Sequence, residues 1–362
     1  MSAVKNPMKI YNLKLTNYRN HSKLNLDFDD KLTLITGPNG SGKSNILEAI
    51  HLLSTGRSDR SRYDKDLIQY NKFFCTVAAK VSTGEEKFDL ELQIIGSEKG
   101  GNLSIKKAKI NKVAKSIQYF TGIFNSVLFS PEDIQLTTGS PSERRKYIDN
   151  LISQVDINYK RALNDYVKAV RQRNKLLENI SQGTGGWDQI DFYTNQILTN
   201  GMLIQEKRGK MFKNIKSIIG DNGIKLGGEG TKLELEYKKN EISKERLEEY
   251  KNREIAAKTC LIGPHRDDFE IHFNKHNVSE FGSRGEQRTC VLALKLAEIE
   301  YIEKIKKERP VLLLDDIFSE LDAKHQEAVL QTIEGQQTTI TSTANLEFIK
   351  DKALRVVLLP IE

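Results

Sequence analysis

The chain contains the segment GPNGSGKS at Gly37–Ser44, which has the spacing G-x-x-x-x-G-K-S. Glycines let the backbone curl so that successive N–H groups point at phosphate oxygens, and a following helix adds its positive N-terminal end. The Lys43 ammonium would reach the β- and γ-phosphates, and the Ser44 hydroxyl would bind Mg²⁺. The pattern predicts a nucleotide site formed by Gly37, Pro38, Asn39, Gly40, Ser41, Gly42, Lys43, Ser44 and Asn45.

Two carboxylates far along the chain complete such a site. Asp315 and Asp316 follow the apolar run Val311–Leu314, which is typical of a buried strand in a parallel sheet. We expect this strand to lie beside the strand that precedes the phosphate loop. Asp315 would then hold Mg²⁺ through water, and Asp316 would position the attacking water as general base. The alternative is an acid that caps a helix at the end of a strand.

A third segment, EFGSRGEQ, places Ser283, Arg284, Gly285 and Glu286 at the start of an apolar helix. By itself it could be an ordinary helix-start loop. The order phosphate loop, Gly-rich helix start, Asp-Asp strand and SELD resembles the ABC-type ATPases. That resemblance implies that Ser283 and Gly285 close over the γ-phosphate held by a second subunit. It also implies that Asp322 communicates across the dimer.

The elements that must position these residues show two kinds of sequence pattern. Strand patterns and one strong helix, apolar at Ile46, Leu47, Ile50 and Leu53, fill the chain to about residue 138. A mostly helical stretch follows, with predicted loops at 182–187 and near 220–230 and Trp187 in a core. An α/β pattern then returns. The sequence predicts an α/β ABC-type head with a mixed sheet (1–138 and 259–362) and an inserted, mostly helical arm domain (139–258).

Composition limits the class of protein. A chain of 362 residues with 38% hydrophobic and 29% charged residues predicts a soluble globular protein without a membrane span or secretion signal. Cys75, Cys260 and Cys290 have no metal-type spacing, so we expect reduced, buried thiols in the cytoplasm. The net charge of +7 permits a polyanionic partner without demonstrating one.

Blocks spread from residue 13 to residue 322 resemble the RecF family of recombination-mediator ATPases. They include LTNYRNHSKLNL, VLFSPEDIQLTTGSPSERRKYID, LIGPHRDDFEI, SRGEQRT and LLLDDIFSELD. The resemblance implies ATP and Mg²⁺ as cofactors, and an ATP-dependent homodimer that binds double-stranded DNA near junctions of single and double strands. It also implies recombinase loading with RecR and RecO, roles in DNA repair, replication-fork maintenance and the SOS response, and a cytoplasmic, nucleoid-associated location.

The resemblance extends to individual residues. It places Asn17 and Arg19 on a strand turn that approaches the nucleotide. The second acid is aspartate and not glutamate, so we expect a weak, DNA-dependent ATPase that acts as a binding switch. Ser342 or Thr343 stands where transporter ATPases carry a switch histidine, and Gln135 is a weak candidate for the Q-loop.

Several basic residues could contact phosphates as well as solvent. The candidates are Arg57, Arg60 and Arg62 after the phosphate-loop helix, and Arg161, Lys168, Arg171 and Arg173 on the insert. His265 and Arg266 could belong to a buried network or to a dimer or DNA element.

Other functions remain as alternatives. A structural DNA clamp of the SMC or Rad50 type would carry a long uninterrupted coiled coil in place of this short insert. A transporter subunit would carry a switch histidine, and its insert would be much shorter than the one in this chain. A fused nuclease would need more than the roughly 40 residues that follow SELD.

Overall fold

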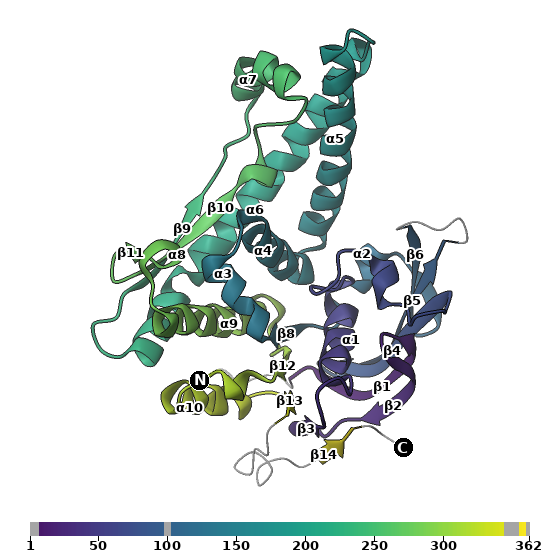
Figure 1. Ribbon diagram of the computed structural model, residues 1–362, viewed down its shortest axis with the longest axis vertical. Coiled ribbons are helices and arrows are strands. Elements are labelled where there is room, and N and C mark those ends of the chain that lie inside the picture. The colour runs from purple at the N-terminus through teal and green to yellow at the C-terminus, as the bar shows by residue number, and fades with distance from the viewer. Residues whose placement is uncertain (1–6, 98–102, 344–354, 360–362) are drawn as a thin grey trace. The chain divides into compact units, whose positions relative to one another are not determined.

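The computed structural model describes residues 7–97, 103–343 and 355–359. The chain forms two compact units (Figure 1), the split unit, Met1–Asp133 with Val291–Glu362, and the inserted unit, Ile134–Cys290. The second boundary falls at 290/291, whereas the sequence suggested 258/259. The difference arises because a strand at Asp268–Phe273 pairs with one at Leu233–Lys238, which keeps this stretch in the inserted unit. The functional roles of the two units, head and arm, stay predictions at this point.

The split unit contains an antiparallel sheet of six strands in the order β2-β1-β4-β5-β6-β7. The bounds are β1 Lys9–Tyr18, β2 His21–Asp27, β4 Phe74–Thr83, β5 Glu86–Gly96, β6 Ser104–Ile110 and β7 Val113–Lys115. The predicted hairpin at Thr83-Gly84 and the following strand pair are confirmed. Alternate residues of β4 and β5 are buried, as a sheet with one face on a core requires.

A second sheet of the split unit is entirely parallel, in the order β14-β3-β13-β12-β8. Its strands are β14 Arg355–Leu358, β3 Leu32–Thr36, β13 Thr338–Ser342, β12 Val311–Asp315 and β8 Ser126–Phe129. The prediction of a buried parallel strand that ends in two carboxylates is confirmed for β12. The prediction that β12 lies beside β3 is wrong, because β13 pairs with both and lies between them.

Helix α1, Lys43–Thr55, supplies the middle of the core of the split unit. The four apolar positions predicted from the sequence, Ile46, Leu47, Ile50 and Leu53, are all fully buried. They belong to one hydrophobic cluster with residues from both sheets, including Leu13, Val77 and Leu313. The phosphate loop is therefore attached to a helix that is fixed along its whole length.

The inserted unit is mostly helical. It contains α3 Gln135–Thr138, α4 Pro141–Val155, α5 Ile157–Ser181, α6 Trp187–Gly227, α7 Lys244–Ala257 and α8 Val278–Phe281, with strands β9 Leu233–Lys238, β10 Asp268–Phe273 and β11 His276–Asn277. Helix α9, Arg284–Lys306, begins in the inserted unit and continues into the split unit. Helix α10 of the split unit spans Ala323–Ile333.

Two details of the insert differ from expectation. The glycine cluster near 220–230 was predicted as a loop, but α6 continues to Gly227. A Cβ added at Gly223 would lie 2.6 Å from Leu233 Cβ, so glycine there serves close packing of α6 against β9. The break at 183–186 is confirmed, but Trp187 is not a core residue because it is 53% exposed.

Candidate functional site

The phosphate loop joins β3 to α1 and depends on its glycines. Gly40 and Gly42 have φ of 82° and 96°, in the left-handed region that favours glycine. A Cβ at Gly42 would lie 2.4 Å from His21 Nε2, so no larger residue fits there. Strand β3, the loop and helix α1 follow one another in the order that the sequence predicts.

Polar groups of this loop suit a bound phosphate chain. The N–H groups of Gly40, Gly42, Lys43 and Ser44 have no acceptor among the described residues, as is usual at a helix N-terminus. The buried Ser41 Oγ also has no hydrogen-bond partner there. Lys43 Nζ donates to the carbonyls of Gly37 at 2.7 Å and Pro38 at 2.9 Å, so the ammonium lies against the loop itself.

A carboxylate meets the loop from strand β12. Ser44 Oγ donates to Asp315 Oδ1 at 2.8 Å, and Thr341 Oγ1 of β13 donates to the same oxygen at 2.7 Å. Burial raises the pKa of Asp315, and the two hydroxyl donors lower it in part. Carboxylate and hydroxyl oxygens are ligands that Mg²⁺ accepts, so Ser44 and Asp315 fit the predicted metal position. Sequence reasoning missed Thr341, since one threonine among several in the strand TTITS carries no signal.

Asp316 follows in a strained conformation. Its φ of 50° lies in the left-handed region, which aspartate tolerates better than most residues. The hydroxyl of Thr343 donates to Asp316 Oδ2 at 3.3 Å, and the backbone N–H of Thr343 donates to Oδ1 at 3.4 Å. Of the two residues proposed at the switch position, Thr343 is therefore the one that contacts the second acid.

The turn between β1 and β2 supports the loop through residues that the sequence did not single out. Asn20 Nδ2 donates to the Gly40 carbonyl at 3.2 Å and Asn20 Oδ1 accepts from Asn45 Nδ2 at 2.9 Å. His21 Nε2 lies 3.1 Å from the Gly42 carbonyl and donates to it. Burial lowers the pKa of His21, so its imidazole is neutral at pH 7. The prediction that Asn17 and Arg19 lie on a turn near the nucleotide could have pointed to the neighbouring Asn20 and His21.

Arg19 itself points elsewhere. Its guanidinium forms a bidentate pair with Glu48 of α1 and also donates to Ser61 Oγ and the Asp66 carbonyl. Arg60 and Arg62 are exposed and Arg57 is half-buried. Of these three, Arg60 lies near enough to Asp315 to lower the pKa of that carboxyl. Among these three arginines, Arg60 is therefore the one whose charge acts on the phosphate site.

The predicted signature segment has its own local structure in the inserted unit. Glu286 N donates to Ser283 Oγ at 3.3 Å, and Ser283 N donates to Glu286 Oε2 at 2.8 Å. This reciprocal arrangement is a capping box at the start of α9. The Ser283 N–H bond lowers the pKa of the Glu286 carboxyl. A side-chain hydrogen bond of Ser283 to the same carboxyl contributes to this lowering of the pKa.

Gly285 has no local reason to be glycine. It is absent from the described glycines with positive φ, and an added Cβ would meet no described atom within 4 Å. Glycine near a helix start costs roughly 0.5–1 kcal/mol relative to alanine. Exposed Arg284 and Gly285 therefore leave a backbone surface that a molecule outside this chain could approach closely.

Asp322, the proposed D-loop residue, caps helix α10. Its side chain accepts from the backbone N–H and from Nδ1 of His325, and the backbone bond lowers its pKa. The carboxylate remains 67% exposed. The capping role is thus present, and a role across a dimer stays a prediction.

The four basic residues predicted on α5 have different environments. Arg161, Lys168 and Arg171 are exposed. Arg173 is only 3% exposed and forms an ion pair with Glu254 at 2.6 Å. Burial and pairing remove Arg173 from the predicted phosphate contacts. Lys175 is exposed and was not singled out.

His265 belongs to a largely buried network of the inserted unit, whereas Arg266 is exposed and donates to the Cys260 carbonyl at 3.3 Å. His265 Nε2 donates to the Cys260 carbonyl, and its Nδ1 lies 2.6 Å from the Tyr166 hydroxyl. Arg208 reaches Asp149, Asp267, Tyr159 and the Pro264 carbonyl in the same region. The structure supports the buried network for His265, and a dimer or DNA role stays a prediction for exposed Arg266.

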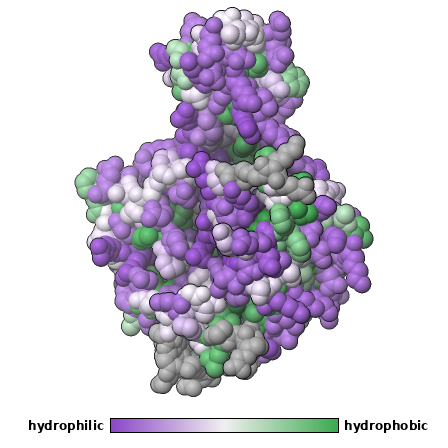
Figure 2. Space-filling model, turned by 45° about the vertical axis from the view of Figure 1, so that its right-hand side comes forward, coloured by the Kyte–Doolittle hydropathy of each residue, from purple (hydrophilic) through white to green (hydrophobic). Residues whose placement is uncertain are grey.

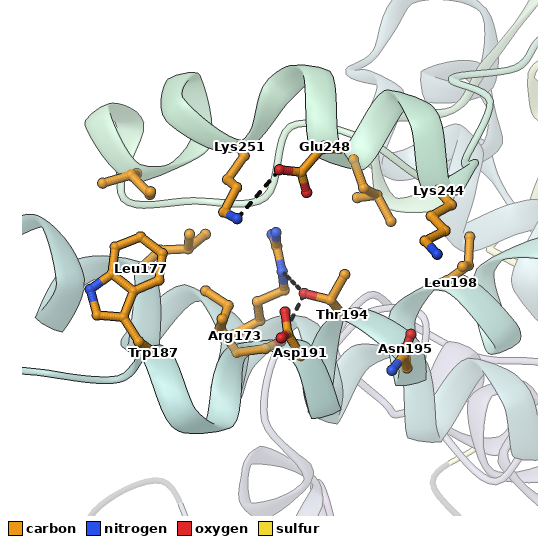
Figure 3. Close-up of a pocket in the computed structure, with 13 residues that line it drawn as sticks. Arg173, Leu177, Trp187, Asp191, Thr194, Asn195, Leu198, Lys244, Glu248 and Lys251 are labelled. Atoms are coloured by element: carbon orange, nitrogen blue, oxygen red, sulfur yellow. Dashed lines mark hydrogen bonds and ion pairs between the residues drawn. The ribbon is translucent and has the colours of Figure 1, made fainter.

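A pocket of the inserted unit has no phosphate-loop residue in its lining (Figure 3). It lies among α5, α6 and α7, with Trp187 at one end and Lys244 at the other. Lys251 pairs with Glu248 and lies over the Trp187 ring, and Arg173 on its floor pairs with Glu254. Two of its three lining cations, Arg173 and Lys251, already have partners, and its lining contains no glycine, so the pocket differs from the phosphate site.

One group of potential metal ligands lies outside the phosphate site. Glu236, Glu270 and His272 bring ligand atoms within 4.8 Å of one another on β9 and β10. Lys238 forms ion pairs with both glutamates, at 2.6 and 3.3 Å. That lysine already neutralises the group, so Ser44 and Asp315 remain the better Mg²⁺ position.

Two remaining predictions concern the cysteines and membrane spans. Cys75, Cys260 and Cys290 are free and buried, as predicted. Burial raises the pKa of Cys75 and of Cys290 to about 12, which keeps both as thiols. Among the described residues, no helix is long and apolar enough to cross a membrane.

Comparison with protein families gives one match over most of the chain. The family model of the RecF/RecN/SMC N-terminal domain matches residues 9–356. The chain is 38% identical to the DNA replication and repair protein RecF of Bacillus thuringiensis (strain Al Hakam) over 96% of its length and 95% of that protein. A RecF of Bacillus cereus (strain B4264) gives the same values.

Solved structures agree with this match. The recombination mediator protein RecF of the RecFOR pathway, in its ATP form, has a TM-score of 0.85 and 32% identity over 96% of this chain and 95% of that one. The RecF-ATPrS structure has the same TM-score and identity. An Smc head domain from Pyrococcus furiosus has a TM-score of 0.54 at 19% identity, over 97% of this chain and 93% of that one, which shows a shared fold only.

Proposed function

This chain belongs to the RecF/RecN/SMC N-terminal domain family and, within it, to the RecF DNA replication and repair proteins. From that premise we propose that it binds ATP with Mg²⁺ on Gly37–Ser44, dimerises with ATP and grips duplex DNA. The observation that carries the proposal is the 2.8 Å hydrogen bond from Ser44 to Asp315. It joins two residues 271 positions apart, which are those that hold Mg²⁺ in P-loop ATPases.

In this proposal the nucleotide chemistry depends on few side chains. Backbone N–H groups of the loop and Lys43 bind the phosphates, and Ser44 and Asp315 hold Mg²⁺. Mg²⁺ neutralises charge that develops on the transferred phosphoryl group. Asp316 accepts a proton from the attacking water while Thr343 fixes the orientation of its carboxylate. Arg60 adds positive charge near Asp315. Asp316 is shorter than glutamate, which favours slow hydrolysis and a role as a binding switch.

The second half of the site comes from another copy of the chain. Ser283, Arg284, Gly285 and Glu286 of one subunit would close over the γ-phosphate held by the other, with Asp322 at the same interface. The support is the open surface at Gly285 and the exposed position of Ser283 beside it. The first turn of α9 adds positive potential to that surface.

The DNA contact lies, in our proposal, on an exposed stripe of α5. Arg161, Lys168, Arg171 and Lys175 follow one another at spacings of seven, three and four residues, which places them on one face of the helix. They span roughly 21 Å at 1.5 Å per residue. A row of cations of this length suits the phosphate backbone and reads no base sequence. Arg57 and Arg62 are weaker candidates on the split unit.

The named relatives suggest the pathway. RecF structures are described as part of RecFOR, so we propose RecR and RecO as partners, junctions of single- and double-stranded DNA as the preferred substrate, and a cytoplasmic, nucleoid-associated location. A structural clamp of the SMC type remains the alternative. It is supported only by a similarity at 19% identity, which concerns the fold.

Light scattering after gel filtration tests the dimer. The wild type should be monomeric without nucleotide and dimeric with MgATP. Ser283→Arg should bind ATP but stay monomeric, because the larger side chain blocks the surface that closes on the phosphate. Lys43→Ala should stay monomeric because it binds ATP weakly. A wild type that binds MgATP and remains monomeric would contradict the dimer proposal, while failure to bind MgATP would contradict the nucleotide site.

A further inference from the structure

The six-stranded sheet of the split unit carries an apolar group on its outer face. Phe74, Ile95 and Ile105 are directly opposite one another on β4, β5 and β6, so their side chains lie on the same face. The neighbouring row, Cys75 and Ile94, points into the core instead. Figure 2 shows apolar residues gathered over this end of the sheet.

The exposure of these side chains varies, because Ile95 is half-buried and Phe74 is 39% exposed, while others are more open. Ile105 is 63% exposed and Leu103, which alternation places on the same face, is 74% exposed. Phe73 and Tyr70 in the segment before β4 are also exposed. Single exposed apolar residues are ordinary, but a contiguous group of them marks an interaction surface.

A strongly basic hairpin borders this group. Residues 103–115 contain five lysines and neither aspartate nor glutamate. Lys106 pairs with Asp64 and Lys109 with Glu91. Lys107, Lys112 and Lys115 form no ion pair among the described residues. Lys107 lies on the same outer face as Ile105, because it aligns with Gln93 and Thr76.

The combination selects one kind of partner. The aliphatic residues Ile95, Leu103 and Ile105 gain by excluding water. Single-stranded nucleic acid would stack bases on Phe74, Phe73 and Tyr70, and a duplex would use the lysines, but either would leave the aliphatic side chains uncovered. An acidic protein segment with apolar side chains satisfies both features at once.

We propose that the outer face formed by Phe74, Ile95, Leu103 and Ile105, with Lys107 at its border, docks an acidic, apolar segment of a partner protein. Apolar side chains of the segment cover the aliphatic group, and a carboxylate of the segment pairs with Lys107. The site lies on the opposite face of the sheet from the core residues of α1, so nucleotide and partner occupy different surfaces of the split unit.

Synthetic peptides test the proposal on the full chain. The probe is a fluorescein-labelled peptide of about twelve residues in which Asp and Glu alternate with Leu and Phe. One control peptide replaces the acids with lysine, a second replaces the apolar residues with serine, and a single-stranded oligothymidylate of similar length tests nucleic acid. Anisotropy titrations at two salt concentrations measure each affinity.

The acidic, apolar peptide should bind at least about 10-fold more tightly than the two control peptides. Ile105→Asp should weaken it by about 10-fold or more, and Lys107→Glu should weaken it and reduce its salt dependence. Val167→Asp, at an equally exposed apolar position on α5, should leave it unchanged. Unaltered MgATP binding and melting temperature would show that the variants fold.

Two outcomes would overturn the proposal. One is equal affinity for all three peptides, or an acidic peptide that binds as well to Ile105→Asp as to the wild type. The other is oligothymidylate binding that displaces the peptide and depends on Lys107 but not on Ile105, which would assign the surface to single-stranded nucleic acid.

Discussion

In the split unit, Ser41 Oγ is buried beside the phosphate loop with no hydrogen-bond partner among the described residues. In the inserted unit, the equally buried Arg208 guanidinium donates to Asp149, Asp267 and Tyr159 and to the Pro264 carbonyl. An unpaired polar group costs free energy that a ligand can recover, whereas a paired one holds the fold. The comparison teaches that the buried hydroxyl of Ser41 is placed where a ligand can pair with it, whereas the Arg208 network holds the inserted unit together.

The strongest test of this comparison removes the centre of the paired network. Arg208→Ala leaves the carboxylates of Asp149 and Asp267 without their cation, so the free energy of unfolding should fall by about 3–5 kcal/mol. Urea unfolding followed by circular dichroism measures the loss. The affinity for MgATP should not change under conditions where the variant is folded.

Arg171→Ala on exposed α5 is the matched control and should change the free energy of unfolding by less than about 0.5 kcal/mol. If Arg208→Ala were no less stable than this control, the network would not hold the inserted unit together.

The second test is made in the split unit, where ligand affinity should change much more than stability. Lys43→Ala removes a charged donor to phosphate, which is worth about 1.5–3 kcal/mol, so the affinity for MgATP should fall roughly 10- to 100-fold. Stability without nucleotide should fall much less than in Arg208→Ala. Isothermal titration calorimetry measures the affinity.

Lys23→Ala, on an exposed part of β2, provides the control for a lost positive charge. Equal weakening of MgATP binding by Lys23→Ala and Lys43→Ala would mean that net charge, and not the loop, binds the nucleotide.

The third test separates exposed from buried cations on α5. Lys168→Ala with Lys175→Ala should lower duplex DNA affinity without loss of stability, because each removes a phosphate contact from the stripe. The slope of log K against log salt should fall by about two units. Anisotropy titrations over a range of salt concentrations measure it.

Arg173→Ala is the comparison on the same helix, since its guanidinium pairs with buried Glu254. It should lose stability and keep the salt slope. A double variant with an unchanged slope would move the DNA contact away from α5.

The smallest expected effect concerns the start of α9. Glu286→Gln weakens the capping box and should lower stability by about 0.5 kcal/mol at pH 7. The carboxyl has a lowered pKa, so its contribution is present above its unfolded pKa and is lost as the pH falls through the folded pKa. The difference from wild type should therefore vanish in acid. Thermal unfolding between pH 3 and 7 measures it.

ATP-driven dimerisation distinguishes the two functions of this segment. Glu286→Gln keeps the Ser283 hydroxyl and the open surface at Gly285, so it should still dimerise. Loss of dimerisation in Glu286→Gln with unchanged stability would show that Glu286 itself lies in the interface.

Local patterns in the sequence determined much of this protein. The glycine spacing of Gly37–Ser44 sets backbone conformations within a few residues, and the buried face of α1 follows from a 3.6-residue period. The strand that ends in Asp315 was predictable because its run of apolar residues is also a local pattern. The family resemblance, spread over separate blocks, was confirmed by the match to residues 9–356.

Tertiary structure decided what depends on neighbours distant in sequence. It placed β13 between β3 and β12, brought the Thr341 hydroxyl to the Asp315 carboxylate and paired Arg19 with Glu48. It also buried Arg173 while its helix neighbours stayed exposed, and it kept α6 helical through glycines that pack on Leu233. Side-chain type and spacing predict local backbone form and one buried face, but the partner of a charge or the neighbour of a strand depends on packing between segments that no local pattern encodes.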